Sequence, residues 1–245
     1  MPKTVVIDCL AESVRRYRPG WAIVAVDVIR ATTTAVTAAA CGRRCFPVRD
    51  AEAALATARR LTEPLLAGEF NGDKPPGFEM DNSPSQIADR EDTHRPLVLM
   101  SSSGTKVIVE ADACEAVYLA CFRSYSALAA HLDGRHDRVA IIGAGSKGEF
   151  REEDQICCAW IGAALMGRGY LPATMQTVDV VTRWRDAPAD ACLRSRSVDF
   201  LKRTGRAVDL DFILGHIDDI RQVFEVRNGE VTRVQPAVVW SGGAA

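Results

Sequence analysis

Acidic, basic and hydroxyl side chains gather at the end of a short apolar run near residue 27. The segment reads D-V-I-R-A-T-T-T and supplies an acid, a base and three hydroxyls: Asp27, Arg30, Thr32, Thr33 and Thr34. In open α/β sheets ligands bind beyond the carboxyl ends of strands, where the next helix offers free N–H groups to a phosphate. An Asp–Arg pair with threonine capping is the alternative, but three hydroxyls exceed what one cap needs, so we favour a site.

A second polar segment opens with Glu69, which follows another short apolar run. The next stretch, Phe70 to Asn82, shows no helical or strand pattern, and Ser83-Pro84 then predicts the start of a helix. Loops of this length are uncommon unless they serve as lids or binding loops. We therefore include Glu69, Asn82 and Ser83 among the candidate residues. A solvated loop rich in glycine and proline is an equally good interpretation.

A third segment, S-S-S-G-T-K at 101–106, again follows an apolar run and precedes a helical pattern. Serine hydroxyls and successive backbone N–H groups can form an anion-binding nest, to which a lysine adds charge. A serine-rich turn with a helix cap explains the same pattern. The spacing G-x-x-x-x-G-K-[ST] is absent, so the segment does not predict a P-loop. The candidate phosphate-binding residues here are Ser102, Ser103, Gly104, Thr105 and Lys106.

A fourth segment places glycines and acids together, because G-A-G-S-K-G at 143–148 precedes Glu153 and Asp154. Its G-x-G-x-x-G spacing is typical of dinucleotide-binding loops. However, a charged stretch separates these glycines from the helix, and no ribose-binding acid is identified on a second strand. Acids in a first helical turn also occur as ordinary partners of the helix dipole.

One interpretation unites the four segments. Asp27, Glu69, Glu153 and Asp154 can converge on Mg²⁺, which prefers oxygen ligands. Arg30, Lys106 and the hydroxyl-rich turns would then hold a phosphate, and the predicted chemistry is metal-assisted phosphoryl transfer to water. The catalytic set on this interpretation is Asp27, Arg30, Glu69 and Asp154.

The elements that must position these residues alternate along the chain as strand, loop and helix, which predicts an α/β fold with a mainly parallel or mixed sheet. Apolar runs indicate a strand near the N-terminus ending at Asp8 and five more at 21–28, 64–67, 97–100, 116–119 and 139–142. Helices are predicted at 33–40, 51–61, 105–111, 126–132 and 152–166. Amphipathic helices follow residue 169, with a break at 186–188, and Asn228-Gly229 predicts a hairpin of strands 223–226 and 230–234.

The amino-acid composition excludes some classes of binding partner. Thirty basic and thirty-two acidic side chains among 245 residues leave a formal net charge of −2, so neither nucleic acid nor membrane is expected as a partner. No apolar run reaches the roughly 18 to 20 residues of a membrane span, and the start of the chain does not read as a secretion signal. The eight cysteines lie among apolar residues without C-x-x-C spacing, which favours reduced thiols in the cytoplasm over disulfides or zinc.

The order of these motifs resembles the 2-phosphosulfolactate phosphatase (ComB-like) family. The resemblance rests on the four segments together with G-F-E-M-D-N-S-P at 77–84, S-R-S at 195–197 and D-L-D-F at 209–212. It implies a three-layer α/β/α fold, Mg²⁺ dependence, and hydrolysis of 2-phospho-3-sulfolactate to sulfolactate and phosphate, a step of coenzyme M synthesis. It also implies one unit over 1–245, made of two similar intertwined halves dividing near 115–135 without a flexible linker.

Carried over onto this chain, the resemblance adds Gly145 and Arg196 to the residues expected to bind a small anionic phosphorylated substrate. The chain departs from the usual motifs at Asp81, Ser103, Ser124 and Val198. An acid gained at 81 and an amide lost at 103 can change substrate choice. A phosphatase for a different phosphorylated acid and a catalytically silent anion-binding protein therefore stay open, as does a homodimer.

Overall fold

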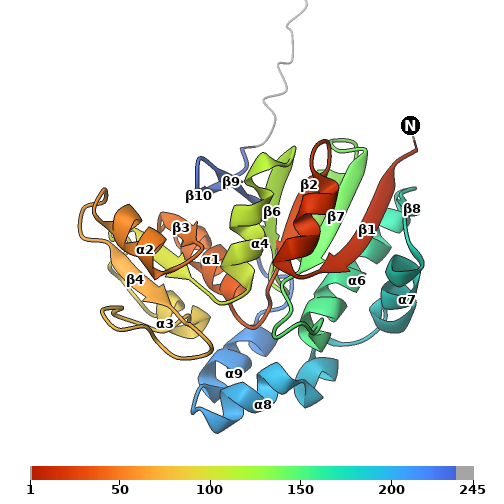
Figure 1. Ribbon diagram of the computed structural model, residues 1–245. Helices are drawn as coiled ribbons and strands as arrows, with labels where there is room; N and C mark the ends of the chain where they lie inside the picture. The colour runs from red at the N-terminus through yellow and green to blue at the C-terminus, as the bar shows by residue number, and fades with distance from the viewer. Residues whose placement is uncertain (1, 236–245) are drawn as a thin grey trace, which may run out of the picture.

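A ten-stranded mixed sheet runs through the molecule in the order β4-β5-β3-β10-β9-β6-β2-β7-β1-β8 (Figure 1). The computed structural model describes residues 2–235. The strands are β1 Thr4–Cys9, β2 Ala22–Val26, β3 Cys45–Val48, β4 Leu65–Gly68, β5 Leu97–Met100, β6 Ala116–Ala120, β7 Arg138–Gly143, β8 Leu171–Pro172, β9 Phe224–Arg227 and β10 Glu230–Arg233.

Two parallel blocks make up this sheet. Strands β4, β5 and β3 pair in parallel, as do β6, β2, β7, β1 and β8. The antiparallel β9–β10 hairpin lies between the blocks, pairing with β6 on one side and β3 on the other. Because β3, β4 and β5 fall between β2 and β6 in the chain, the blocks are not consecutive halves. The predicted division near 115–135 into similar halves stays a prediction.

The hairpin confirms the turn expected from Asn228-Gly229. Both residues have positive φ, 52° and 76°, a combination that asparagine and glycine tolerate best. The two-residue strand β8 is missed by the sequence pattern, and so is strand β3. Strand β3 is only four residues long and contains Pro47, which weakens a strand pattern.

Helices follow most strands. The α-helices are α1 Ala31–Ala40, α2 Ala51–Ala58, α3 Pro84–Ala88, α4 Gly104–Glu110, α5 Tyr125–Leu132, α6 Glu152–Met166, α7 Met175–Trp184, α8 Arg196–Arg203 and α9 Ala207–Gly215. Short 3₁₀ segments are η1 Ala11–Tyr17, η2 Ala111–Ala113 and η3 Ala189–Arg194. Among residues 2–235, no helix combines the length and hydropathy that crossing a bilayer requires.

Alternate side chains of the central strands enter two hydrophobic cores, one on each face of the sheet. In β1, Val5 and Ile7 pack in the core that includes α5, α6 and α7. Val6 packs in the opposite core, which includes η1, α1 and α4. The sheet therefore lies between two helical layers, which confirms the predicted α/β/α fold. Helices α8 and α9 lie together at the lower edge of the view in Figure 1.

Arg43 holds the segment before β5 from inside the protein, and its loss should destabilise the fold. It is only 1% exposed, and its guanidinium donates to the carbonyl oxygens of Asp92 and Arg95 and to the Asp92 carboxylate, at 2.7–2.8 Å. Arg43→Met removes all three donors, so we expect a loss of about 2–3 kcal/mol in urea unfolding. Arg44→Met, which removes an exposed pair with Glu230, should cost about 1 kcal/mol or less. Equal losses in the two variants would contradict this assignment.

A candidate active site at the carboxyl ends of the strands

A cavity of about 570 Å³ brings together residues from five distant parts of the chain. Asp27 follows β2, Glu69 follows β4, Ser102 follows β5 and Gly145 follows β7, and all four line the cavity. Helix α8 supplies the remaining wall through Arg196, Phe200 and their neighbours. The cavity thus lies where parallel strands end, which is the expected place for a ligand site in such a sheet.

Three buried acids lie in this cavity: Asp27, Glu153 and Asp154. Both oxygens of Asp154 accept backbone hydrogen bonds, Oδ1 from the Val28 N–H at 2.9 Å and Oδ2 from the Gly145 N–H at 3.1 Å. The first turn of α6 therefore fastens the loop after β2 to the loop after β7.

The negative charges of these three acids repel one another. The pKa of Asp27 is raised to about 7, mainly by burial. The N–H of Ala31 and the charge of Arg30 oppose this shift, and the carboxylates of Glu69 and Glu153 add to it. Burial also raises the pKa of Asp154 well above its ordinary value, with Asp27 and Glu153 adding to the effect. Burial likewise raises the pKa of Glu153, although hydroxyls of Ser197 and Ser195 oppose the shift. A cation among these acids would remove the repulsion.

The donor chemistry of the site fits a hard cation such as Mg²⁺. The donors are carboxylate oxygens, and within the described residues Oε2 of Glu153 is buried without a hydrogen-bond partner. Across residues 2–235, no three His, Cys, Asp or Glu side chains are already gathered as a ready-made metal cage. An ion that keeps several of its waters, as Mg²⁺ does, needs only one or two carboxylates.

Glu69 organises the long loop instead of presenting free oxygens. Its Oε1 accepts from the Ser102 N–H at 2.6 Å, and its Oε2 accepts from the Gly72 N–H at 2.7 Å and the Ser102 hydroxyl at 3.0 Å. The predicted role of Glu69 as a metal ligand therefore has less support than that of Asp27 or Glu153. Its contacts tie the loop after β4 to the loop after β5.

Several predicted phosphate-binding residues do not line the cavity. The hydroxyls of Thr32, Thr33 and Thr34 donate to backbone carbonyls of the β2–α1 loop and β6, at 2.7–3.1 Å. Thr105 likewise bonds to the backbone of Ser101. Their predicted contact with phosphate is corrected, because these tight buried turns need the hydroxyls to satisfy their own backbone.

Two more predicted residues, Ser83 and Gly104, do not line the cavity but contact residues of the site. Ser83 caps α3, donates its hydroxyl to Asp209 at 2.6 Å and does not line the cavity. Gly104 provides space: a Cβ there would lie 2.1 Å from Oδ2 of Asp27. By contrast Asn82, Ser102, Ser103 and Lys106 line the cavity, and their predicted contact with phosphate stays a prediction. Oδ1 of Asn82 is buried and has no partner in the described part of the chain.

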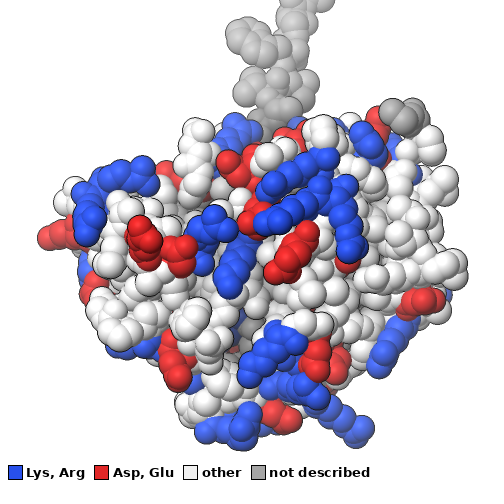
Figure 2. All heavy atoms as spheres, viewed as in Figure 1, with Lys and Arg blue, Asp and Glu red and all other residues white. Residues whose placement is uncertain are grey.

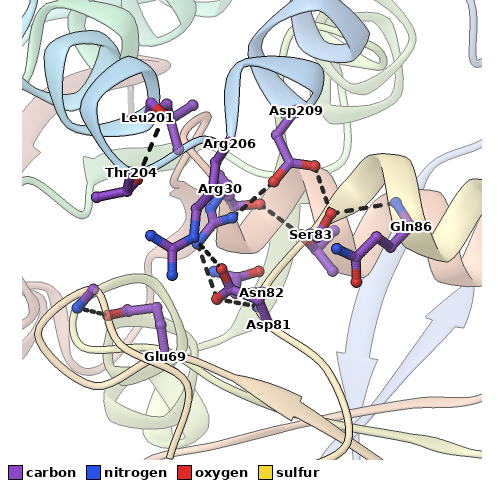
Figure 3. A network of polar contacts seen from close by, with 12 residues as sticks. Arg30, Glu69, Asp81, Asn82, Ser83, Gln86, Leu201, Thr204, Arg206 and Asp209 are labelled. Carbon is purple, nitrogen blue, oxygen red and sulfur yellow. Dashed lines mark hydrogen bonds and ion pairs between the residues drawn. The ribbon is translucent and has the colours of Figure 1, made fainter.

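Arg30 is fixed between two carboxylates (Figure 3). Its guanidinium donates to Asp209 at 2.7 Å and to Asp81 at 3.1 Å, and Arg206 pairs with the other oxygen of Asp81. Asp81 was expected to add negative charge beside the substrate. The two arginines compensate that charge, so Asp81 acts mainly as a support for Arg30.

The rim of the cavity is more basic than predicted. Lys106 and Arg196 line it, and so do three cations that the sequence interpretation omitted: Lys147, Arg151 and Arg203. Lys147 and Arg151 lie in the charged stretch between the glycines and α6, to which the sequence analysis assigned no binding role. Over the face shown in Figure 2, basic and acidic side chains are interspersed.

The fold and this site define an α/β protein with a buried carboxylate cluster inside a basic pocket, an arrangement suited to phosphate esters. The sequence profile of one family, described as 2-phosphosulpholactate phosphatase, matches residues 9–229. The chain belongs to this family.

Individual relatives agree with the family match. The 2-phosphosulfolactate phosphatase of Methanothermobacter thermautotrophicus is 33% identical over 194 residues, covering 77% of this chain and 80% of the relative. A probable 2-phosphosulfolactate phosphatase of Clostridium perfringens is 25% identical over 223 residues, covering 88% and 90%. A probable 2-phosphosulfolactate phosphatase of Pseudothermotoga lettingae is 39% identical over 139 residues, covering 56% of this chain and 59% of that protein.

Proposed function

We propose that this protein is a Mg²⁺-dependent phosphatase of the cytoplasm that hydrolyses 2-phospho-3-sulfolactate to 3-sulfolactate and phosphate, a step of coenzyme M synthesis. The observation that carries the proposal is the buried cluster of Asp27, Glu153 and Asp154 inside a basic cavity. Family membership supports the same reaction. The free and mostly buried cysteines support a reducing compartment.

One group of cavity residues would bind the metal ion, and a second group would bind the phosphate. Asp27 and Glu153 are the residues that would hold Mg²⁺, which when bound neutralises phosphoryl charge and polarises a water. Asp154, whose two oxygens accept backbone N–H groups, lies beside them and fixes the surrounding loops. On the anion side, Lys106 and the turn of Ser102 and Ser103 face the cavity at the start of α4, where they would hold phosphate oxygens. Arg30 contributes a positive charge in a position fixed by Asp81 and Asp209.

The overall reaction is hydrolysis of the phosphate ester by one water molecule. The oxygen of water forms a bond to phosphorus, the bond between phosphorus and the ester oxygen breaks, and one proton of water ends on the sulfolactate hydroxyl. Residues that exclude bulk water and fix the phosphate raise the rate by positioning and electrostatics. Phe200 of α8 closes one side of the cavity by packing against Gly72, where a Cβ would lie 2.4 Å from the ring.

Phosphate release should require a divalent cation. We expect 2-phosphosulfolactate to be hydrolysed with Mg²⁺, more slowly with Zn²⁺, and not in the presence of EDTA, because the donors are carboxylates without histidine or cysteine. The measurement is colorimetric phosphate release from 2-phosphosulfolactate and a panel of other phosphorylated acids. Full turnover in EDTA would disprove the metal requirement. Release from another acid alone would favour the alternative substrate, and binding without release would favour a silent anion-binding protein.

The cysteines should take no part in the reaction. Burial raises the pKa of Cys45, Cys121, Cys157 and Cys158, whereas Cys41 is exposed at the end of α1, and none of the five lines the cavity. Treatment of the folded protein with iodoacetamide should therefore modify Cys41 first and leave phosphate release unchanged. Mass spectrometry would locate the modified thiols. A loss of activity that parallels alkylation of Cys41 would show that this interpretation is wrong.

A further inference from the structure

Arg151, at the start of α6, is a buried cation with few hydrogen-bond partners. The residue is 8% exposed and lines the cavity. Its guanidinium donates through one terminal nitrogen to Glu149 at 2.7 Å, and within residues 2–235 its buried Nε has no hydrogen-bond partner. A buried guanidinium normally satisfies several of its five N–H donors, so this site is prepared for a further acceptor.

Glu153, close to Arg151 in the chain, has an acceptor atom without a hydrogen-bond partner in the part of the chain that the structure describes. Oε2 of Glu153 is also buried without a partner, although only two positions separate it from Arg151. Residues two apart at a helix start point in different directions, so the two groups do not pair with each other. Both line the same cavity. The start of α6 thus offers an unpaired acceptor suited to a cation and an unpaired donor suited to an anion.

Glu149 shows which kind of anion fits. One carboxylate oxygen accepts from Arg151 at 2.7 Å, and the other accepts from Arg196 of α8 at 2.6 Å. The Glu149 side chain is 46% exposed and that of Arg196 is 73% exposed, so the bridge is held only weakly and can be displaced. A carboxylate of the protein therefore occupies the place that an acidic group of a ligand would take.

We propose that Arg151 binds an acidic group of the substrate other than its phosphate, and that Glu149 occupies this subsite until substrate displaces it. This inference rests on the proposed function, because 2-phosphosulfolactate carries a carboxylate and a sulfonate in addition to the phosphate. A carboxylate presents two coplanar oxygens and a sulfonate presents three tetrahedral oxygens, and in either group two oxygens can accept from one guanidinium. Arg151 thereby distinguishes multiply charged substrates from simple phosphate esters.

Four substrates separate the acidic groups: 2-phosphosulfolactate, 2-phospholactate without the sulfonate, phosphorylated 2-hydroxyethanesulfonate without the carboxylate, and ethyl phosphate with neither. We expect Arg151→Gln to lower kcat/KM for 2-phosphosulfolactate by about ten- to a hundredfold, and to affect ethyl phosphate far less. The analogue that behaves like ethyl phosphate identifies the missing group as the one that Arg151 binds. Arg151→Lys should restore part of the loss, because it keeps the charge but not the paired donors.

We expect Glu149→Gln to improve the binding of 2-phosphosulfolactate, whereas Arg151→Gln weakens it. Glu149→Gln removes the competing carboxylate, so the KM for 2-phosphosulfolactate should fall about two- to fivefold, in keeping with a weak exposed ion pair. Arg168→Gln is the matched control, because Arg168 is exposed just beyond the other end of α6 and does not line the cavity. An equal loss on all four substrates in Arg151→Gln would overturn the inference, as would an increased KM in Glu149→Gln.

Calorimetric binding of 3-sulfolactate separates this inference from the proposed function. The compound carries both acidic groups and no phosphate, so its binding does not depend on turnover. We expect the affinity to fall at least tenfold in Arg151→Gln and to rise in Glu149→Gln. Unchanged affinity in both variants would reject the subsite even if the protein hydrolyses 2-phosphosulfolactate. Hydrolysis of none of the four substrates would reject the proposed function, with the binding result still deciding the subsite.

Discussion

Asp27→Asn should lower kcat for 2-phosphosulfolactate by on the order of a hundredfold or more while the protein stays folded. Asp27 is buried in the cavity beside Glu153 and Asp154, and it is the acid best placed after β2 to hold a cation. Asparagine keeps the size of the side chain and an oxygen for the Ala31 N–H, but it removes the charge. The loss should therefore appear in kcat and in Mg²⁺ affinity, measured by phosphate release across a Mg²⁺ titration.

The same substitution should stabilise the metal-free protein. Burial raises the pKa of Asp27 from 3.8 to about 7, so the protonated carboxyl favours the folded state at low pH. This contribution is fully present below pH 3.8 and is lost as the pH rises through about 7. At pH 8 without metal, Asp27→Asn should raise Tm by several degrees, and the difference should shrink toward pH 4.

Asp179→Asn is the control, because Asp179 is an exposed carboxylate in α7 that does not line the cavity. It should change neither kcat nor Tm measurably. Wild-type turnover from a folded Asp27→Asn protein would remove Asp27 from the reaction. A lower Tm at pH 8 would show that Asp27 is not under charge repulsion in the folded state.

The sequence predicted which strand ends come together better than it predicted the contacts of each side chain. Apolar runs that end in polar residues identified the strand ends at Asp27, Glu69, Ser102 and Gly145, and all four line one cavity. This convergence has a physical reason, because parallel strands in one sheet bring their carboxyl ends to the same edge. A local pattern therefore contains long-range information once the strands are known to be parallel.

The direction of a side chain is not contained in such a pattern. Thr32, Thr33 and Thr34 read as a hydroxyl cluster, yet each hydroxyl serves the backbone of a tight turn. Arg30 read as a free cation, yet it is shared between Asp81 and Asp209, which lies 179 positions away in the chain. Arg151 was not among the predicted site residues, yet the fold buries it in the cavity wall. Each of these outcomes depends on contacts that only the assembled fold creates.

Gly104→Ala should abolish most activity through contact with Asp27. An added Cβ would lie 2.1 Å from Oδ2 of Asp27, 2.7 Å from its Cβ and 2.8 Å from the Cβ of Ala31. Helix α1 fixes Ala31, so the start of α4 and the Asp27 carboxylate must move apart. Alanine raises helix propensity by about 1 kcal/mol, but an overlap of this size exceeds that gain. We expect a lower Tm and a loss in kcat on the order of a hundredfold.

Two comparisons test whether the loss acts through Asp27. Gly215→Ala is the matched control: Gly215 ends α9, nothing lies within 4 Å of its added Cβ, and its backbone needs no positive φ, so stability and activity should be kept. Because Gly104 and Asp27 are in contact, their effects on kcat should not add. The double variant Gly104→Ala/Asp27→Asn should then be about as slow as Asp27→Asn alone. Losses that multiply in the double variant would show that Gly104 supports the reaction by another route, such as by shaping the cavity wall at the start of α4.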